Sequence, residues 1–296
     1  MKPVSTQSPE RPALLPVRID AKLCRRDGLC AMVCPLSIIG RAEDGLAVAE
    51  PAMAGRCIRC GHCVAVCPAG ALSLGEADGW ENAGPGEPIR KELCVSLEQA
   101  EQLLRTRRSV RLFKPEPPDR ELLVRLLDDT QWAASGHNAR PVAFCVHHGR
   151  EAVSRVAEET AQWMRLESER SPELAARFHL PGLLRALARG RDLICRSAPC
   201  LVVAHAPETG ITPREDALTA LTYLEIAAHA AGLGACWAGF VTIAAARHEP
   251  LLRALGVPEG HAMCGGLMLG RPALRYARIP PRPRAAITWA ATRKEV

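Results

Sequence analysis

The stretch Cys57-Ile-Arg-Cys60-Gly-His-Cys63-Val-Ala-Val-Cys67-Pro68 carries four cysteines at the spacing C-x2-C-x2-C-x3-C-P. This spacing is typical of sites that hold cubane iron–sulfur clusters, and the fourth cysteine of such a run ligates a second cluster. A partner run is therefore expected. It lies upstream as Cys24-Arg-Arg-Asp27-Gly-Leu-Cys30-Ala-Met-Val-Cys34-Pro35, with the same spacing and an aspartate in place of the second cysteine.

The two runs predict two clusters with crossed ligands. One cluster is expected on Cys34, Cys57, Cys60 and Cys63. The other is expected on Cys24, Cys30 and Cys67, with Asp27 or solvent on its fourth iron. Aspartate is a harder and weaker iron ligand than thiolate, so this second site is expected to hold a cubane with a labile iron or a three-iron cluster. Paired C-x2-C motifs also bind zinc, but two runs that both end in C-x3-C-P favour iron–sulfur clusters.

Bulk properties narrow the class of protein. A chain of 296 residues suggests about two domains. The net charge of +6 is modest and the arginines are spread over many segments, so nucleic-acid binding is not expected. No apolar run is long enough to span a membrane, and the first ten residues lack the apolar core of a secretory signal.

Six cysteines outside the two runs are expected to be mostly buried free thiols. Thiolates free to hold iron imply a reducing compartment, so a cytoplasmic location is expected.

Composition divides the chain into three parts. Residues 17–75 form a small unit that the clusters would staple, because so short a segment cannot build a large core. Residues 76–92 are rich in Gly, Pro and acids and are predicted to be a linker. Residues 93–296 alternate predicted helices with apolar strands, which favours an α/β or α+β domain. The helix predicted over 216–231 is apolar nearly all round, so we expect it in a core or a subunit interface.

A cluster of basic residues opens this second domain. Arg105, Arg107, Arg108, Arg111 and Lys114 crowd ten residues around Ser109. The pattern suits a solvated helix end, where arginines lie near the last carbonyls. It also suits a phosphate site, because guanidinium groups and a hydroxyl bind phosphate oxygens well.

Several motifs, in order, resemble those of FMN-dependent nitroreductases. Arg107-Arg-Ser-Val-Arg111-Leu-Phe is similar to their first motif, Ser135-Gly-His-Asn138-Ala-Arg140-Pro141 to their second and Gly232-Leu-Gly-Ala-Cys-Trp-Ala-Gly239-Phe to their third. Leu269-Gly-Arg-Pro272 and the basic tail with Trp289 complete the series. The resemblance covers about residues 96 to 290. With the two cysteine runs, the whole chain resembles fusions of a two-cluster ferredoxin domain and a nitroreductase.

The resemblance implies an α+β nitroreductase fold and a homodimer with FMN at the subunit interface. Residues expected to hold the ribityl phosphate are Arg107, Ser109 and Arg111, joined by Arg282 or Arg284, and Arg108 is also expected to bind the cofactor. Residues expected against the flavin, contributed across the dimer, are Ser135, Gly136 and Asn138. Gly239 matches a backbone amide near the reactive N5 edge. Arg140 departs from the family pattern, which usually has glutamine there, and adds a charge near the flavin or phosphate.

The function implied is that of an oxidoreductase. Electrons from reduced ferredoxin or NAD(P)H would pass through the clusters to FMN and then to a small electron-poor acceptor, a nitro compound or an activated alkene. Two alternatives stay open: a non-enzymatic electron-transfer protein that serves a partner, and a flavoenzyme that resembles reductive dehalogenases. No catalytic side chain is predicted, because the chemistry belongs to the cofactor.

Overall fold

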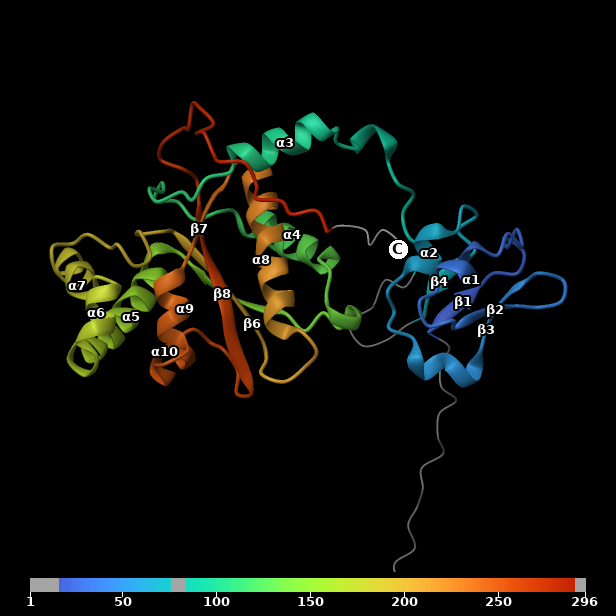
Figure 1. The fold of residues 1–296 in the computed structure, drawn as a ribbon, viewed down its shortest axis with the longest axis horizontal. Coiled ribbons are helices and arrows are strands. Elements are labelled where there is room, and N and C mark those ends of the chain that lie inside the picture. Colours follow the sequence, from blue (N-terminus) through green and yellow to red (C-terminus); the bar gives the residue numbers. More distant parts are fainter. Residues whose placement is uncertain (1–15, 76–83, 291–296) are drawn as a thin grey trace, which may run out of the picture. The chain divides into compact units, whose positions relative to one another are not determined.

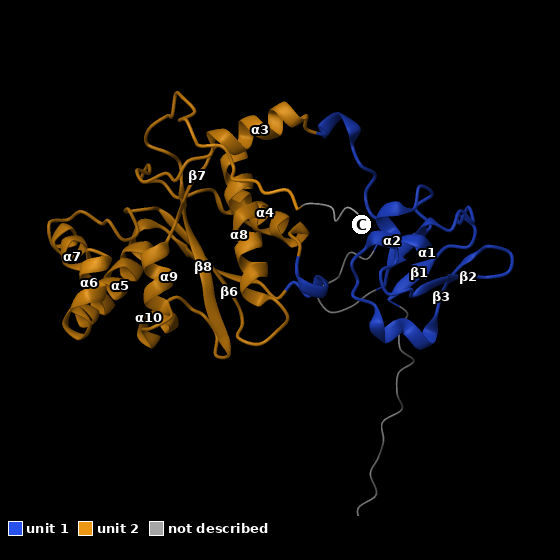
Figure 2. Ribbon diagram, in the orientation of Figure 1, with its two compact units in different colours: residues 1–94, 135–140 blue, residues 95–134, 141–296 orange. Residues whose placement is uncertain are grey.

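The computed structural model describes residues 16–75 and 84–290. Contacts divide the chain into two compact units (Figure 2). The first unit comprises the described residues up to Cys94 together with Ser135–Arg140, and the second comprises Val95–Ala134 and the chain from Pro141 onward. Residues 76–83 of the predicted linker lie outside the described residues.

The first unit is built from short elements around the two cysteine runs. Its strands form two antiparallel pairs, β1 (Val17–Ile19) with β4 (Leu72–Leu74) and β2 (Ile39–Arg41) with β3 (Ala47–Ala49). Its helices are α1 (Leu29–Val33) and α2 (His62–Val66), with 3-10 turns η1 (Pro51–Arg56), η2 (Lys91–Leu93) and η4 (Gly136–Asn138). The core is small, as expected, and includes two of the run cysteines, Cys30 and Cys63.

The two cysteine runs adopt matching backbone conformations. Gly28 and Gly61 precede α1 and α2 at φ 76° and 74°, in the left-handed region that favours glycine. Cys34 and Cys67 follow these helices, and each sulfur accepts a backbone N–H at 3.3 Å, from Ile38 and Ala71 respectively. The repeat seen in the sequence is thus a repeat in structure.

The second unit is an α+β domain around one antiparallel sheet. The strand order is β5 (Ala143–His148), β6 (Cys200–Pro207), β8 (His261–Gly270) and β7 (Gly234–Trp237). All neighbouring strands in this sheet are antiparallel. The central strand β6 is buried over nearly its whole length, as its apolar sequence predicts.

Helices cover both faces of this sheet (Figure 1). Leu201 and Val203 of β6 face a core shared with one group of helices, whereas Val202 and Ala204 face the other group, since side chains alternate along a strand. The first group contains α5 (Arg150–Arg170), α6 (Pro172–Arg177), α7 (Leu180–Ala188), α9 (Gly239–Ala245) and α10 (Glu249–Ala254). The second contains α4 (Arg120–Asp128) and α8 (Pro213–Ala230). Helix α3 (Leu97–Thr106) and the 3-10 turn η3 (Asp129–Trp132) complete the unit.

Local sequence signals set several helix ends. Ser96 and Gln99 form a capping box at the start of α3, because each side chain bonds the other's backbone N–H. Asp119 caps α4 by accepting a hydrogen bond from the Leu122 N–H at 3.0 Å. Within the described ranges, no helix combines the length and the apolar character needed to cross a membrane.

The cysteines outside the runs are free thiols, as expected. Cys195, Cys200 and Cys236 are buried, and Cys145 and Cys264 are partly buried. The expectation of burial is wrong for Cys94, which is exposed at the end of the short turn η2.

Candidate functional site

Four cysteines from both runs line one cavity of the first unit. They are Cys34, Cys57, Cys60 and Cys63. The first of them comes from the upstream run and the other three from the downstream run, which is the grouping that crossed ligation requires. The structure therefore brings together the side chains that the sequence assigned to one cluster.

Cys63 is the most buried member of this set. Burial raises the pKa of the Cys63 thiol to about 11, although a backbone hydrogen bond at Val64 lowers it. The charges of Cys60, Cys57 and Cys34 raise the same pKa further. Bound iron would reverse this preference, because a thiol that coordinates a metal is deprotonated.

The upstream loop holds the first three predicted ligands of the other cluster. Burial raises the pKa of Cys30, and the charges of Cys24 and Asp27 raise it as well. One carboxylate oxygen of Asp27 accepts the Leu29 N–H at 3.1 Å, and the side chain is otherwise exposed. Among the described residues, no three His, Cys, Asp or Glu side chains lie close enough to bind one single metal ion. In a cubane each thiolate binds a different iron, so its ligands are spread more widely than those of one ion.

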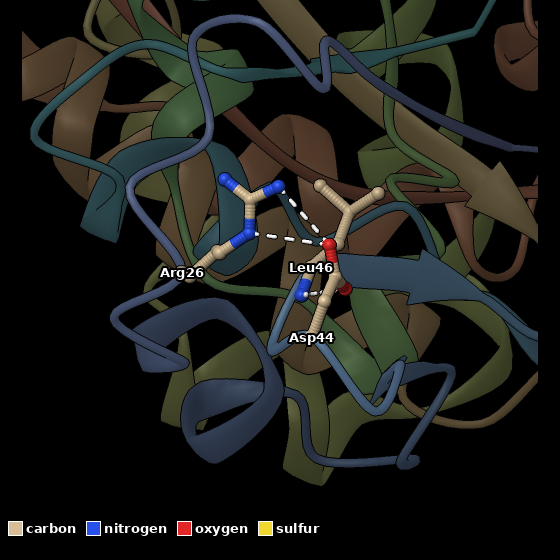
Figure 3. Close-up of polar contacts among 3 residues, drawn as sticks. All are labelled: Arg26, Asp44 and Leu46. Atoms are coloured by element: carbon tan, nitrogen blue, oxygen red, sulfur yellow. Dashed lines mark hydrogen bonds and ion pairs between the residues drawn. The ribbon is translucent and has the colours of Figure 1, made fainter.

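A surface clamp holds the upstream loop to the β2–β3 hairpin (Figure 3). Arg26 donates to Asp44 Oδ2 from Nη2 at 3.0 Å and from Nε at 3.3 Å, and the Leu46 N–H donates to Asp44 Oδ1 at 3.0 Å. The Leu46 amide and the Arg26 guanidinium hold the pKa of Asp44 below its usual range. Both side chains of the pair are exposed, so the ion pair adds little to the free energy of unfolding. Its main effect is to hold the upstream loop against the hairpin.

The segment 135–140, predicted to lie against a flavin, is grouped with the first unit. The Asn138 side-chain amide donates to the carbonyls of Ile58 at 2.9 Å and Arg59 at 3.0 Å, between the first two cysteines of the downstream run. The Arg140 guanidinium donates to Asn138 Oδ1 at 3.2 Å. Its burial, followed by the charge of Arg59, lowers the pKa of Arg140, and the nearby Cys60 raises it. No pattern in the sequence predicts this contact with the downstream cysteine run.

Backbone strain marks the same segment. His137, Asn138 and Arg140 have φ values of 49°, 56° and 47°, a region that non-glycine residues rarely adopt. Ser135 Oγ accepts the Arg140 N–H at 3.1 Å and so closes the turn. Strained residues of this kind persist only where the surroundings hold them, and they concentrate at functional sites.

In the second unit, the first and third predicted motifs lie side by side. Ser109 forms a parallel bridge with Ala235 of β7, and the Val110 N–H donates to the Ala235 carbonyl at 2.8 Å. A Cβ at Gly234 would lie 2.6 Å from Val110 Cγ2, so only glycine allows this approach. The close packing makes the basic segment and strand β7 one continuous piece of structure.

Arg107 forms an ion pair within the chain. Its Nη1 donates to Glu225 Oε1 at 2.9 Å, and the other carboxylate oxygen accepts the Trp237 indole N–H at 3.2 Å. Glu225 was not among the predicted site residues, because the helix predicted over 216–231 is apolar nearly all round. The predicted phosphate residue Arg107 therefore has its charge balanced by a buried glutamate.

A cavity of about 320 Å³ opens beside this region of the second unit. Arg111 and Gly239, both predicted site residues, line it together with Arg196, Cys236 and Trp237. Burial raises the pKa of Cys236, whereas the charges of Arg111 and Arg196 lower it, so both guanidinium groups lie near this thiol. Arg196 was not among the predicted site residues, since the residues around it match none of the motifs.

The other predicted residues do not line this cavity. Arg108 is half-buried, and Arg282 and Arg284 are exposed in the C-terminal tail. Ser109 lies at the bridge to β7 and contributes to the frame of the site. Of the residues predicted for the second unit, the structure thus brings Arg111 and Gly239 together in one cavity.

Comparison with protein families gives two matches. The sequence model of the Nitroreductase family matches residues 104–271, more than half of the chain. The model described as a 4Fe-4S dicluster domain matches residues 16–68, which contain both cysteine runs. A comparison with curated protein sequences gave no match.

Solved structures similar to this chain share the fold of the second unit. A nitroreductase with bound FMN from Bacteroides fragilis NCTC 9343 is 21% identical with a TM-score of 0.51, over 63% of this chain and 97% of that chain. One from Desulfitobacterium hafniense DCB-2, also with bound FMN, is 24% identical with a TM-score of 0.51, over 64% and 97%. A mutant of an FMN- and NADPH-dependent nitroreductase from Sphigopyxis sp. strain HMH is 24% identical with a TM-score of 0.50, over 65% and 99%.

Proposed function

The chain belongs to the nitroreductase family of oxidoreductases and carries an N-terminal 4Fe-4S dicluster domain, and we propose that it passes electrons through iron–sulfur clusters to FMN and on to a small electron-poor acceptor. The acceptor class is a nitro compound or an activated alkene. The observation that carries the proposal is the presence, in one chain, of a cavity lined by four cysteines and a second cavity lined by Arg111 and Gly239.

The residues of the second unit fit a flavin. Bound FMN would supply the redox chemistry, because flavins accept electrons singly and deliver them in pairs. Arg111 offers a guanidinium group for a phosphate. Trp237 and the backbone at Gly239 line the same cavity, and Glu225 holds the Trp237 indole in place. The solved neighbours from Bacteroides and Desulfitobacterium are described with bound FMN, which supports this assignment.

The residues of the first unit fit iron–sulfur clusters. Cys34, Cys57, Cys60 and Cys63 would hold one cubane, and backbone N–H groups such as that of Ile38 stabilise negative charge on sulfur. Cys24, Cys30 and Cys67 would hold the other cluster, with Asp27 or solvent on the remaining iron. We further propose a homodimer, because the family resemblance implies that FMN lies at a subunit interface.

The experiment is an anaerobic donor and acceptor screen on the full-length protein. Purified protein should carry about seven to eight irons per chain, as two clusters require, and release FMN on denaturation. Reduced ferredoxin should drive reduction of nitro or enoyl acceptors faster than NADPH does. NADPH belongs in the screen because the neighbour from Sphigopyxis is described as NADPH-dependent.

Each result of that screen bears on the proposal. Bound zinc without inorganic sulfide would contradict the clusters, and release of FAD would contradict FMN. Reduced clusters and flavin without turnover of any small acceptor would favour an electron-transfer protein. Turnover of halogenated acceptors alone would favour a dehalogenating enzyme.

A further inference from the structure

The cavity that contains Arg111 is lined by both cationic and apolar side chains. Arg111 and Arg196 are the two charged residues in its lining, and no acidic residue among the described ones lines it. Phe178, Phe240 and Ile243 provide apolar surface. Two like charges at one cavity repel each other, and an anion between them relieves that repulsion.

Arg196 is held in place by an organised loop. The Asp192 carboxylate accepts backbone N–H groups from Ile194 at 2.9 Å, Cys195 at 2.8 Å and Ser197 at 2.8 Å. Ile194 and Cys195 are buried, so they anchor the loop in the core. The loop backbone that carries Arg196 is therefore held in place without a bound ligand.

The backbone at Arg196 is strained. Arg196 and the following Ser197 have φ values of 59° and 49°, two consecutive non-glycine residues in the left-handed region. Such strain costs free energy and is retained where the surrounding structure enforces it, often at ligand sites. Here the hydrogen bonds to Asp192 enforce it, and Arg196, a half-buried residue, lines the cavity.

Arg196 and Arg111 differ from Arg107 in their partners. Arg107 is paired with Glu225. In the described part of the chain, neither Arg111 nor Arg196 forms a salt bridge with an acidic side chain. Their positive charge is therefore available to a ligand.

We propose that Arg196 and Arg111 together bind an anion, a phosphate or a carboxylate, whose apolar carrier lies against Phe178, Phe240 and Ile243. The inference rests on the proposed function in that Arg111 is also the expected contact of the FMN phosphate. Two sources of the anion fit this chemistry: the phosphate of FMN and an anionic group of the acceptor.

The test compares Arg196→Gln with Arg191→Gln, a matched control on the same loop that is exposed and lies outside the cavity lining. Dissociation constants are measured for FMN and riboflavin on flavin-free protein. KM values are measured on holoenzyme for 4-nitrobenzoate and for neutral nitrobenzene. If the anion is the FMN phosphate, Arg196→Gln raises the dissociation constant of FMN about tenfold or more and leaves that of riboflavin unchanged. If the anion belongs to the acceptor, FMN binding is unchanged and KM rises about tenfold for 4-nitrobenzoate alone.

Two further measurements separate this inference from the proposed function. Arg196→Lys keeps the positive charge and should recover most of the lost binding. Inorganic phosphate should raise the thermal stability of wild-type protein and of Arg191→Gln more than that of Arg196→Gln. If the wild type binds no flavin, the proposed function fails, and the phosphate experiment still decides the anion pair. If Arg196→Gln and Arg191→Gln give the same values in all these measurements, the proposal that Arg196 and Arg111 bind one anion is wrong.

Discussion

Arg107 and Glu225 form an ion pair of 2.9 Å that joins the residue after helix α3 to helix α8. The carboxylate is nearly buried, with 8% of its side chain exposed, while the arginine keeps 33% exposed. Since Glu225 also accepts the Trp237 indole N–H, it fixes two residues of the predicted flavin motifs at once. The pair therefore organises the site as well as balancing a charge.

Glu225→Gln should lower the free energy of unfolding by about 1.5–3 kcal/mol, the range for a hydrogen bond that involves a charged group. The glutamine keeps the size of the side chain but leaves Arg107 without its counter-charge. Urea unfolding followed by tryptophan fluorescence measures the change. Glu215→Gln, at an exposed position in the first turn of the same helix, is the control and should change stability by less than about 0.5 kcal/mol. Equal effects of the two variants would contradict a special role for Glu225.

Cys60→Ala should abolish electron transfer from reduced ferredoxin and lower the iron content by about one cluster. Cys60 lines the cavity with three other cysteines, and alanine cannot replace its thiolate. Cys94→Ala is the matched control, because this thiol is exposed and lies outside both runs. Photoreduced FMN in the Cys60 variant should still reduce a nitroarene. Unchanged ferredoxin-driven turnover would show that this cluster is off the main electron path.

Asn138→Ala should make the downstream cluster loop less stable. The substitution removes two hydrogen bonds to the carbonyls of Ile58 and Arg59, each contributing about 0.5–1.5 kcal/mol. Cluster absorbance should therefore decay faster in the presence of an iron chelator. His137→Asn, an exposed neighbour with a side chain that tolerates the same positive φ, is the control. Equal decay rates in both variants would argue against the contact.

His205 should make the second unit less stable in acid. Burial, and then the charge of His261, lower the pKa of His205, whose ring nitrogen lies 2.9 Å from that of His261. An unfolded histidine titrates near pH 6.5, so the unfolded state binds the proton first as pH falls. The stability linked to His205 is therefore full above about pH 6.5 and is lost as pH falls toward the lower folded pKa.

The measurement is urea unfolding at about pH 7.5 and about pH 5.5. Wild type should lose more stability between these values than His205→Gln, which lacks the titrating ring. His179→Asn, at an exposed position, should lose as much as the wild type. A variant at position 205 that keeps the full pH dependence would place its origin elsewhere.

Gly234→Ala should lower the free energy of unfolding by about 1–3 kcal/mol, because the new methyl group overlaps Val110. It should weaken FMN binding as well, since the basic segment must move away from β7. Gly182→Ala is the matched control: it lies in helix α7 with no atom within 4 Å of the added Cβ. That change should stabilise the protein by up to about 1 kcal/mol. Denaturant unfolding and flavin titration report both effects.

Much of the fold follows from local sequence signals. The Ser96–Gln99 capping box, the buried strand around Val202 and the two cysteine runs each have a pattern that short-range physics explains. The apolar stretch around Val202 forms β6, Cys200–Pro207, whose residues are buried except for the last. These elements depend on neighbours in the chain, so the sequence alone predicts them.

The parts that escaped prediction depend on contacts between distant residues. Asn138 reaches carbonyls in the downstream cysteine run, and nothing near it in sequence signals that partner. Arg196 becomes a site residue because Asp192 shapes its loop and because Cys236 of strand β7 lines the same cavity. Glu225 was hidden in a helix whose other buried residues are mostly apolar. Such pairings are properties of the folded chain.

The bridge between Ser109 and Ala235 also sets the distance between two residues of the candidate site. It fixes Arg111, a few residues beyond one end, and Gly239, a few residues beyond the other, at a set separation, since neither segment can slide while Gly234 is pressed against Val110. A bound molecule that touches both residues must match that span. The chain would then select its ligand by length as well as by charge. A molecule too short to reach Arg111 and Gly239 at the same time would bind weakly, even if it could contact either residue alone.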